Sequence, residues 1–425
     1  MGLWSRSSGA IPMEPSQLAI GIYVWLDLNW TEHPFLANRF LIKTDKDIAI
    51  IQSLDCKGRL YYFPDKGKPA LPVVVQATAM AEDAAQKLAQ EALAKDMAQL
   101  AKAKKDQLWQ QKDAEARTRK AWEAAANGVR DALANMSSSP KVAGEQIRQV
   151  SQDTAATVAQ GKEVFFQLVA NADTPGPQFH ALNTMILSVM VGKKAGLSQA
   201  QLADLAMAAL AHDAGKSQVP QHILKNAHRK KHEEDFYQQH VHHSVQLATL
   251  AGTFSASALA MIADHHETLD GKGWPNKKSD LSAGARILAL VNRYERLCSP
   301  EAPAKEALTP AEALAQLFRQ ESGKYDAGLL SIMVKLLGVY PPGTVVQLSD
   351  ESFALVIAPG PTSLQPKVLI YRPELPKDEA PFLSLATQTD VKISAAVRPG
   401  KLQPEVLDWL DPQQRLAYFF SSADV

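Results

Sequence analysis

Ten of the eleven histidines in this 425-residue chain lie between His180 and His266. Around them, over about residues 178–337, apolar residues recur at helical spacing, as in Leu182, Met185 and Val189, which predicts a region that is helical throughout. Packing alone requires few histidines in such a region. Neutral imidazole is a common ligand of divalent transition metals, and carboxylates supply oxygen ligands beside it. We therefore expect a helical domain that holds metal ions.

The strongest single motif is the pair His212-Asp213, which follows an apolar helical segment and precedes Gly215, where the chain can turn sharply. Asp213 has two oxygens and can bridge two metals. Lys216 lies about one turn further on, where its ammonium group can neutralise a phosphate.

Taken singly, the other histidines have ordinary explanations. His180 fits a core or surface position, and the run from His240 to His243 fits a solvated helix face. Three more are predicted to be exposed in a basic stretch: His222, His228 and His232. His265 and His266 are harder to explain by packing, because acids flank them and a turn at residues 270–273 follows. Taken together, the order of one histidine, His-Asp, one histidine and His-His is specific.

Composition divides the rest of the chain into segments. Short apolar runs predict strands at residues 20–28, 39–42 and 59–63, with a helix from Asp45 to Ser53, and a second group of strands at residues 345–348, 353–357 and 367–371. A helical stretch is predicted over residues 142–169. The expected units are a small α/β module at 11–75, a helical connector at 78–136, a metal-hydrolase domain at 141–337 with its core at 178–337, a β appendage at 338–375 and a C-terminal tail at 376–425.

The connector is rich in Ala, Lys and Glu and contains no proline, which favours helix at nearly every position. Its apolar stripe is interrupted at Lys104. Two interpretations stay open: a solvated connecting helix with one stripe packed on the body, or a coiled coil that pairs two protomers as a homodimer.

Charge and composition exclude several classes of partner. Lys plus Arg and Asp plus Glu both number 45, so nothing draws the chain toward a nucleic acid polymer or an anionic membrane. Two cysteines do not make a disulfide scaffold and suit a reducing compartment. The first ten residues lack the apolar core of a signal peptide, and no run is long enough to span a bilayer. We expect a cytoplasmic protein.

In order and spacing, His180, residues 212–216, His240 and residues 265–275 resemble the HD-GYP domain, the cyclic di-GMP phosphodiesterase class of HD phosphohydrolases. The match continues through residues 285–287 and 337–343. The first part of the chain, including residues 33–35 and 38–42, is similar to the small domain of unknown function that often precedes bacterial HD-GYP domains. The resemblance covers most of the chain apart from the connector and the tail.

The resemblance implies a mainly helical fold and two divalent metal ions, with iron or manganese expected first. One ion would be held by residues matching His180, His212 and Asp213, and the second by those matching His240, His265 and His266. In this family a metal-bridging hydroxide opens cyclic di-GMP to pGpG or GMP, and Asp213 and Lys216 take the catalytic positions. The matching substrate or partner loop comprises Asp270, Gly271, Gly273, Trp274 and Pro275, together with Arg286.

Two departures from the family pattern bear on activity. A metal-ligating aspartate of the family is Asn292 here, whose amide oxygen has no formal charge and should hold a metal more weakly. The tyrosine of the family's GYP motif is Trp274, which keeps an aromatic ring but loses the hydroxyl.

The departures leave three functions open. The first is a phosphodiesterase acting on cyclic di-GMP and slowed by Asn292. The second is a catalytically degenerate receptor for cyclic di-GMP, or a docking partner of diguanylate cyclase (GGDEF) domains. The third is an HD hydrolase of another phosphorylated nucleotide.

Overall fold

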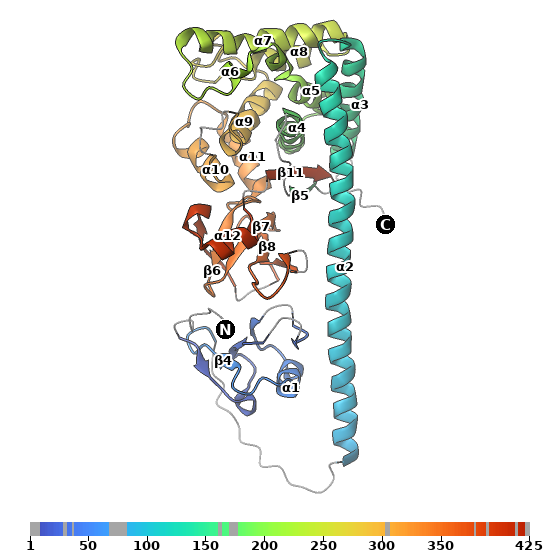
Figure 1. The fold of residues 1–425 in the computed structure, drawn as a ribbon, viewed down its shortest axis with the longest axis vertical. Coiled ribbons are helices and arrows are strands. Elements are labelled where there is room, and N and C mark those ends of the chain that lie inside the picture. The colour runs from blue at the N-terminus through green and yellow to red at the C-terminus, as the bar shows by residue number, and fades with distance from the viewer. Residues whose placement is uncertain are drawn as a thin grey trace.

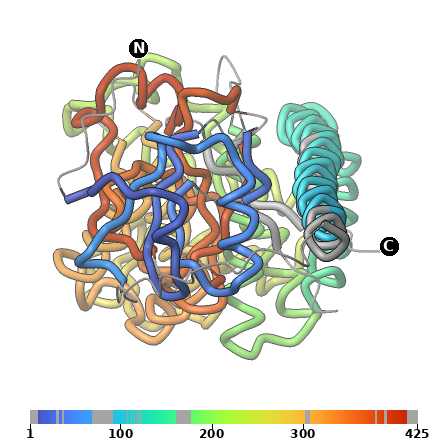
Figure 2. Tube along the Cα trace, turned by 90° about the horizontal axis from the view of Figure 1, so that it is seen from below, coloured from blue at the N-terminus to red at the C-terminus, as the bar shows by residue number. Residues whose placement is uncertain are grey.

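The computed structural model describes residues 9–28, 32–35, 38–67, 83–159, 164–169, 177–301, 307–377, 380–387, 391–412 and 415–420. Three bodies follow one another along the long axis of the molecule, and one long helix runs beside all three (Figure 1). From the end of the molecule this helix lies to one side of the compact bodies (Figure 2). The mainly helical fold expected from the sequence is confirmed.

The N-terminal module is a small antiparallel sheet with one helix. Its strands lie in the order β1-β4-β2-β3, and Thr44 caps the helix through a hydrogen bond from the amide of Asp47. The elements are β1 (Ile11–Pro12), η1 (Pro15–Gln17), β2 (Tyr23–Leu26), β3 (Arg39–Leu41), α1 (Asp45–Ser53) and β4 (Leu60–Tyr62). The three predicted strands and the helix are all present.

The connector is one continuous helix, α2 (Asp83–Asn135). Its first half contacts the N-terminal module, where Lys46 and Asp96 form an ion pair at 3.0 Å and Lys104 Nζ donates to the backbone oxygen of His33 at 3.0 Å. Its second half joins the main core through Trp122 and Val129. The helix therefore packs along its own chain, as the connecting-helix interpretation expects, and the homodimer stays a prediction.

The largest of the three bodies follows α2 in the sequence, is helical and contains the main core. Its central helices α4 and α5 are apolar on nearly all sides, which explains why they are enclosed by the others. The elements are α3 (Pro140–Ala159), α4 (Pro177–Lys194), α5 (Gln199–Ala211), η3 (Ala214–Gln218), α6 (Gln221–Leu224), α7 (Lys231–Ala251), α8 (Ala256–Asp264), α9 (Ala283–Cys298), α10 (Pro310–Arg319) and α11 (Ala327–Leu337). Among the described residues, none of the helices is both long and apolar enough to cross a membrane.

The C-terminal region lies between the helical body and the N-terminal module (Figure 1). Five antiparallel strands form a sheet in the order β10-β6-β7-β8-β9, and β11 pairs instead with β5. The elements are β5 (Val164–Val169), β6 (Val345–Leu348), β7 (Phe353–Ala358), β8 (Lys367–Ile370), β9 (Phe382–Ser384), β10 (Ile393–Val397), η5 (Pro399–Lys401), α12 (Pro404–Leu410) and β11 (Arg415–Phe420).

Two expectations from the sequence are wrong here. The predicted helix over residues 142–169 ends at Ala159, and Val164–Val169 is a strand because Arg415–Phe420 pairs with it along its whole length. The β appendage does not end at residue 375, because β9 and β10 from the supposed tail complete the sheet. Residues 68–82, 160–163 and 421–425, which parts of these expectations cover, lie outside the described residues.

Candidate metal centre

Three helix ends and one helix face converge on the cluster that the sequence indicated. His212 caps the end of α5, and Asp213 follows it directly, before η3 begins. His240 projects from the middle of α7, and His265 caps the end of α8 with His266 next to it. His180 comes from the first turn of α4. The helices α4, α5, α7 and α8 thus bring together residues up to 86 positions apart in sequence.

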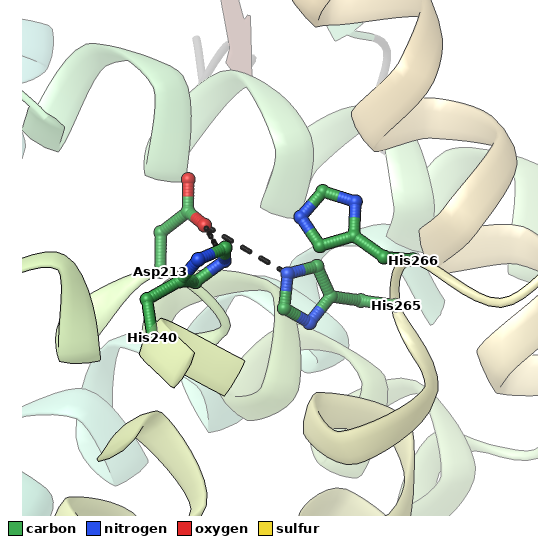
Figure 3. A group of neighbouring side chains, drawn as sticks. All are labelled: Asp213, His240, His265 and His266. Atoms are coloured by element: carbon green, nitrogen blue, oxygen red, sulfur yellow. Dashed lines mark ion pairs between the residues drawn. The ribbon is translucent and has the colours of Figure 1, made fainter. Parts of the chain in front are cut away.

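Asp213 lies at the centre of this cluster. Its Oδ1 faces His240 Nε2 at 3.3 Å and His265 Nε2 at 3.8 Å, as Figure 3 shows. Its Oδ2 faces the Nε2 atoms of His180 and His212, each at 3.4 Å. One carboxylate therefore stands between two groups of imidazoles, the arrangement in which it can serve metals on both sides.

Three of the histidines are fixed in one orientation by their own helices. The Nδ1 atoms of His212, His240 and His265 lie 2.6–2.7 Å from the backbone oxygens three residues earlier. A carbonyl oxygen can only accept a hydrogen bond, so the proton is assigned to Nδ1 and the lone pair of Nε2 faces the cluster. His180 is held in the same way by a carboxylate, because its Nδ1 contacts Glu295 on α9.

Burial keeps four imidazoles of the cluster neutral. Burial is the main cause that lowers the pKa of His212 and His240, and it lowers the pKa of His265 and His266 well below the usual range. Burial would raise the pKa of Asp213, but Lys216, His212 and Arg296 outweigh it and hold that pKa well below its ordinary value. Neutral imidazole and ionised carboxylate are the forms that bind metal.

The unpaired donor atoms show where a metal fits. Among the buried side-chain atoms of the described residues that have no hydrogen-bond partner, four lie together here: Asp213 Oδ1 and the Nε2 atoms of His240, His265 and His266. They belong to side chains that can place one ligand atom each within 4.8 Å of one another. Buried polar groups are normally paired, so a convergent set of four without partners indicates a cation-binding site. The donor set of imidazole nitrogens and a carboxylate oxygen fits a divalent transition metal.

Asn292 lies on α9 one turn before Glu295 and Arg296, which both contact the cluster. Residues three and four positions apart share a helix face, so Asn292 is on the face turned toward the metal ligands. Its side chain is only 2% exposed and its Oδ1 has no hydrogen-bond partner. The position fits a neutral oxygen ligand and stays a prediction.

Lys216 is held over Asp213 rather than exposed. Its Nζ donates to Asp213 Oδ2 at 2.8 Å and to Glu301 Oε2 at 3.2 Å, and Tyr237 donates to the same glutamate oxygen at 3.2 Å. Burial would lower the pKa of Lys216, but Asp213, Tyr237 and Glu301 outweigh it and the pKa is raised. Lys216 is therefore a fixed positive charge at the cluster.

The predicted substrate loop lies against the cluster through Trp274. The indole stacks on His266 with ring centres 3.9 Å apart and meets His240 edge-on at 5.5 Å. Gly273 permits this approach, since a Cβ there would lie 2.4 Å from the Cα of Glu267. The Glu267 carboxylate accepts hydrogen bonds from the amides of Asn276 and Lys278 and so fixes the loop.

The remaining predicted residues have local roles in the structure. Asp270 accepts hydrogen bonds from Thr268 and the amide of Lys272, which shapes the turn around Gly271. Arg286 donates to the backbone oxygen of Leu281 and lies 3.6 Å from Asp326. No contact of these residues with the metal ligands is recorded among the described residues, so their part in binding stays a prediction.

Family models match two parts of the chain. The model described as "HD domain" matches residues 163–329, which contain the whole cluster. This part of the chain is an HD domain. A second model, "Domain of unknown function (DUF3391)", matches residues 11–147, which comprise the N-terminal module and most of α2. The HD domain and its N-terminal companion expected from the sequence are both confirmed.

The curated proteins to which this chain is similar are named as cyclic dinucleotide phosphodiesterases. It is 27% identical over 220 residues to "Cyclic di-GMP phosphodiesterase PA4108" of Pseudomonas aeruginosa, covering 50% of this chain and 52% of that protein. Identity to "Cyclic di-GMP phosphodiesterase PdeB" of Borreliella burgdorferi is 24%, covering 42% and 47%. Identity to "3'3'-cGAMP-specific phosphodiesterase 3" of Vibrio cholerae is 27%, covering 41% and 38%. The chain thus spans about half or less of the relatives it matches.

Among solved structures, this chain is similar to Bd1817, a HDG"Y"P protein from Bdellovibrio bacteriovorus. The similarity covers 76% of this chain and 98% of that chain, at 15% identity and a TM-score of 0.42.

Sequence reasoning missed Glu295, Arg296, Glu301 and Tyr237. The local sequence gave one signal for the first two, which lie three and four residues after the candidate ligand Asn292 and therefore share its helix face. Tyr237 has a similar signal, because it lies three residues before His240 on α7 and shares its helix face. Glu301 contacts the cluster only through the tertiary fold, and no spacing in the sequence indicates it.

Proposed function

We propose that this chain is a metal-dependent phosphodiesterase that hydrolyses a cyclic dinucleotide, with cyclic di-GMP as the first candidate and pGpG or GMP as product. The observation that carries the proposal is the buried set of four unpaired ligand atoms around Asp213 Oδ1. A set built only for packing would not leave four buried donor atoms without partners.

A bound divalent metal would supply Lewis-acid charge and a water of lowered pKa for attack on phosphorus. The protein supplies the rest. His240, His265 and His266 present neutral Nε2 atoms, and Asp213 is ionised in their midst. Lys216 and Arg296, both held at Asp213 Oδ2, place two positive charges where phosphate oxygens would lie. These residues bind and orient an anionic phosphodiester before reaction.

The choice of cyclic di-GMP rests on the motifs in the sequence and on the names of the relatives, which also include 3'3'-cGAMP-specific enzymes. Trp274 supports a ring-bearing substrate, because it lies beside the cluster and is only partly buried. An indole in that position can stack on a nucleobase.

Anaerobic hydrolysis assays with Mn²⁺ or Fe²⁺ test this proposal, with cyclic di-GMP and 3'3'-cGAMP as parallel substrates. His240→Ala should abolish turnover, because it removes one ligand of the set. His242→Ala is the matched control, since that histidine lies two positions along the same helix and is exposed. Equal activity in both variants, or turnover of neither substrate by the metal-loaded wild type, would overturn the proposal.

A second candidate is a receptor without catalysis, or a protein that docks a diguanylate cyclase (GGDEF) domain through the loop at residues 270–275. Arg296 favours it, since this cation pairs with Asp213, the central ligand, and the neutral Asn292 stands where the family has an acid. Binding of cyclic di-GMP or of a cyclase domain that survives the double change His212→Ala plus Asp213→Ala would favour this candidate.

A further inference from the structure

The two oxygens of Asp213 have different surroundings. Oδ2 accepts hydrogen bonds from Lys216 at 2.8 Å and from Arg296 at 2.5 Å, and the same oxygen faces His180 and His212. One half of the cluster, consisting of His180, His212 and Asp213 Oδ2, therefore already contains two protein cations.

The other half contains none among the described residues. Asp213 Oδ1 faces the Nε2 atoms of His240 and His265, and His266 Nε2 completes this set of unpaired ligand atoms. In the first half, His180, His212 and Asp213 also bring one ligand atom each within 4.8 Å of one another, with His180 Nε2 3.1 Å from His212 Nε2. Both halves therefore hold ligand atoms, but the protein cations gather at only one of them.

The charge balance of the cluster points in the same direction. Three carboxylates, on Asp213, Glu295 and Glu301, face two cations, Lys216 and Arg296. These five side chains together carry one excess negative charge. One divalent ion reverses this to a single excess positive charge, whereas a second would leave three. Unbalanced charge is costly in a buried site, so the balance favours one ion.

We propose that this HD domain holds one divalent ion, on His240, His265, His266 and Oδ1 of Asp213, and that Arg296 occupies the place of a second. The guanidinium lies on the Asp213 oxygen that a second ion would need, together with His180 and His212. Sequence resemblance led us to expect two ions, and Arg296 was no part of that expectation. Arg296 is thus a positioning residue, whose guanidinium supplies at Asp213 Oδ2 the positive charge that a second metal ion would supply. The inference rests on the proposed function only in requiring a metal at this cluster.

The test is the metal content of protein that has been loaded anaerobically with Mn²⁺ and desalted. Elemental analysis gives the number of ions per chain. Electron paramagnetic resonance distinguishes an isolated ion from a coupled pair by its spectrum. The wild type should hold one ion per chain with the spectrum of an isolated ion. Arg296→Ala should hold two, with the spectrum of a coupled pair. Arg293→Ala is the matched control, because Arg293 lies on the same helix but pairs with Glu321, and it should keep one ion.

Arg296→Gln serves as a second variant if the alanine protein does not fold, because it removes the charge while keeping a hydrogen-bond donor. Two ions in the wild type, or one ion in folded variants of Arg296, would overturn the inference. The readout does not depend on turnover: wild-type protein with one ion and no hydrolysis refutes the proposed function alone. Active wild-type protein with two ions refutes only the single-ion assignment.

Discussion

Gly215 is the point where the segment carrying Asp213 and Lys216 touches the helix carrying His240. Its amide donates to Ser244 Oγ at 2.8 Å, and a Cβ on it would lie 2.2 Å from the backbone oxygen of His240 and 2.4 Å from the amide of Ser244. Both obstacles are backbone atoms of α7, so neither can rotate away. In Gly215→Ala the η3 segment must move from α7 by about 1 Å, and overpacking of this kind costs about 1–3 kcal/mol of folding free energy.

The same movement separates Asp213 from His240, whose facing atoms are 3.3 Å apart. Metal sites tolerate shifts of only about 0.2 Å, so we expect metal affinity to fall by about 10–100-fold. Mn²⁺ titration against a competing chelator measures the affinity, and urea unfolding of metal-free protein measures the stability.

Gly128→Ala is the control for this change. A Cβ at Gly128 would meet no atom within 4 Å, so the variant should keep its metal affinity and gain about 0.5–1 kcal/mol from helix propensity. If Gly215→Ala matched the wild type in both affinity and stability, the contact between η3 and α7 would not be what positions Asp213.

Three further predictions follow from individual sites. Asn292→Asp should raise Mn²⁺ affinity about tenfold, because it adds a charged oxygen on the helix face that carries Glu295; an unchanged affinity in folded protein would remove Asn292 from the ligand set. Burial, with a smaller contribution from Arg372, lowers the pKa of Lys104 to about 7. Below that pH the folded state carries the full free-energy cost of the buried charge. This cost declines as the pH rises toward 10.5, the pKa of an unperturbed lysine in the unfolded chain. Lys104→Met should therefore raise the thermal unfolding midpoint near neutral pH and have a smaller effect near about pH 10; a gain independent of pH would contradict this cause. Removal of metal by a chelator should lower the free energy of unfolding by about 2.7 kcal/mol, compared with protein at a metal concentration of about 100 times Kd. Urea unfolding measures this difference. Equal stability with and without chelator would contradict a metal site in the folded state.

The fold was predictable from the sequence where the signals are local. The helix at Asp45–Ser53 was predicted at its observed bounds, and in the structure Thr44 and Asp47 form a capping box at its start. The strand at Val164–Val169 was mistaken for helix, since a short apolar run fits either structure. Its partner, Arg415–Phe420, lies about 250 residues later in sequence, and only the tertiary fold decides between the two.

The candidate site was likewise predictable where its residues stand in local motifs, and it was not predictable where residues far apart in sequence come into contact. The histidines and Asp213 stand in motifs whose order can be read directly, and the structure gathers them around one carboxylate. The contacts of Glu295 with His180 and of Arg296 with Asp213 join residues 115 and 83 positions apart. A pairing over such a distance has no periodic signature in a single sequence, so the charge that shapes one half of the cluster emerged only from the fold.

The most direct test of the proposed phosphodiesterase is the dependence of turnover on metal in the same protein sample. The protein is stripped of metal, Mn²⁺ or Fe²⁺ is added back stepwise under anaerobic conditions, and conversion of cyclic di-GMP to pGpG or GMP is followed. We predict no product without metal, a rate that rises with bound metal and levels off when the cluster is full, and no rate in Asp213→Asn at any metal concentration. A folded wild-type protein whose cluster is full of metal and which converts neither cyclic di-GMP nor 3'3'-cGAMP would contradict the proposal.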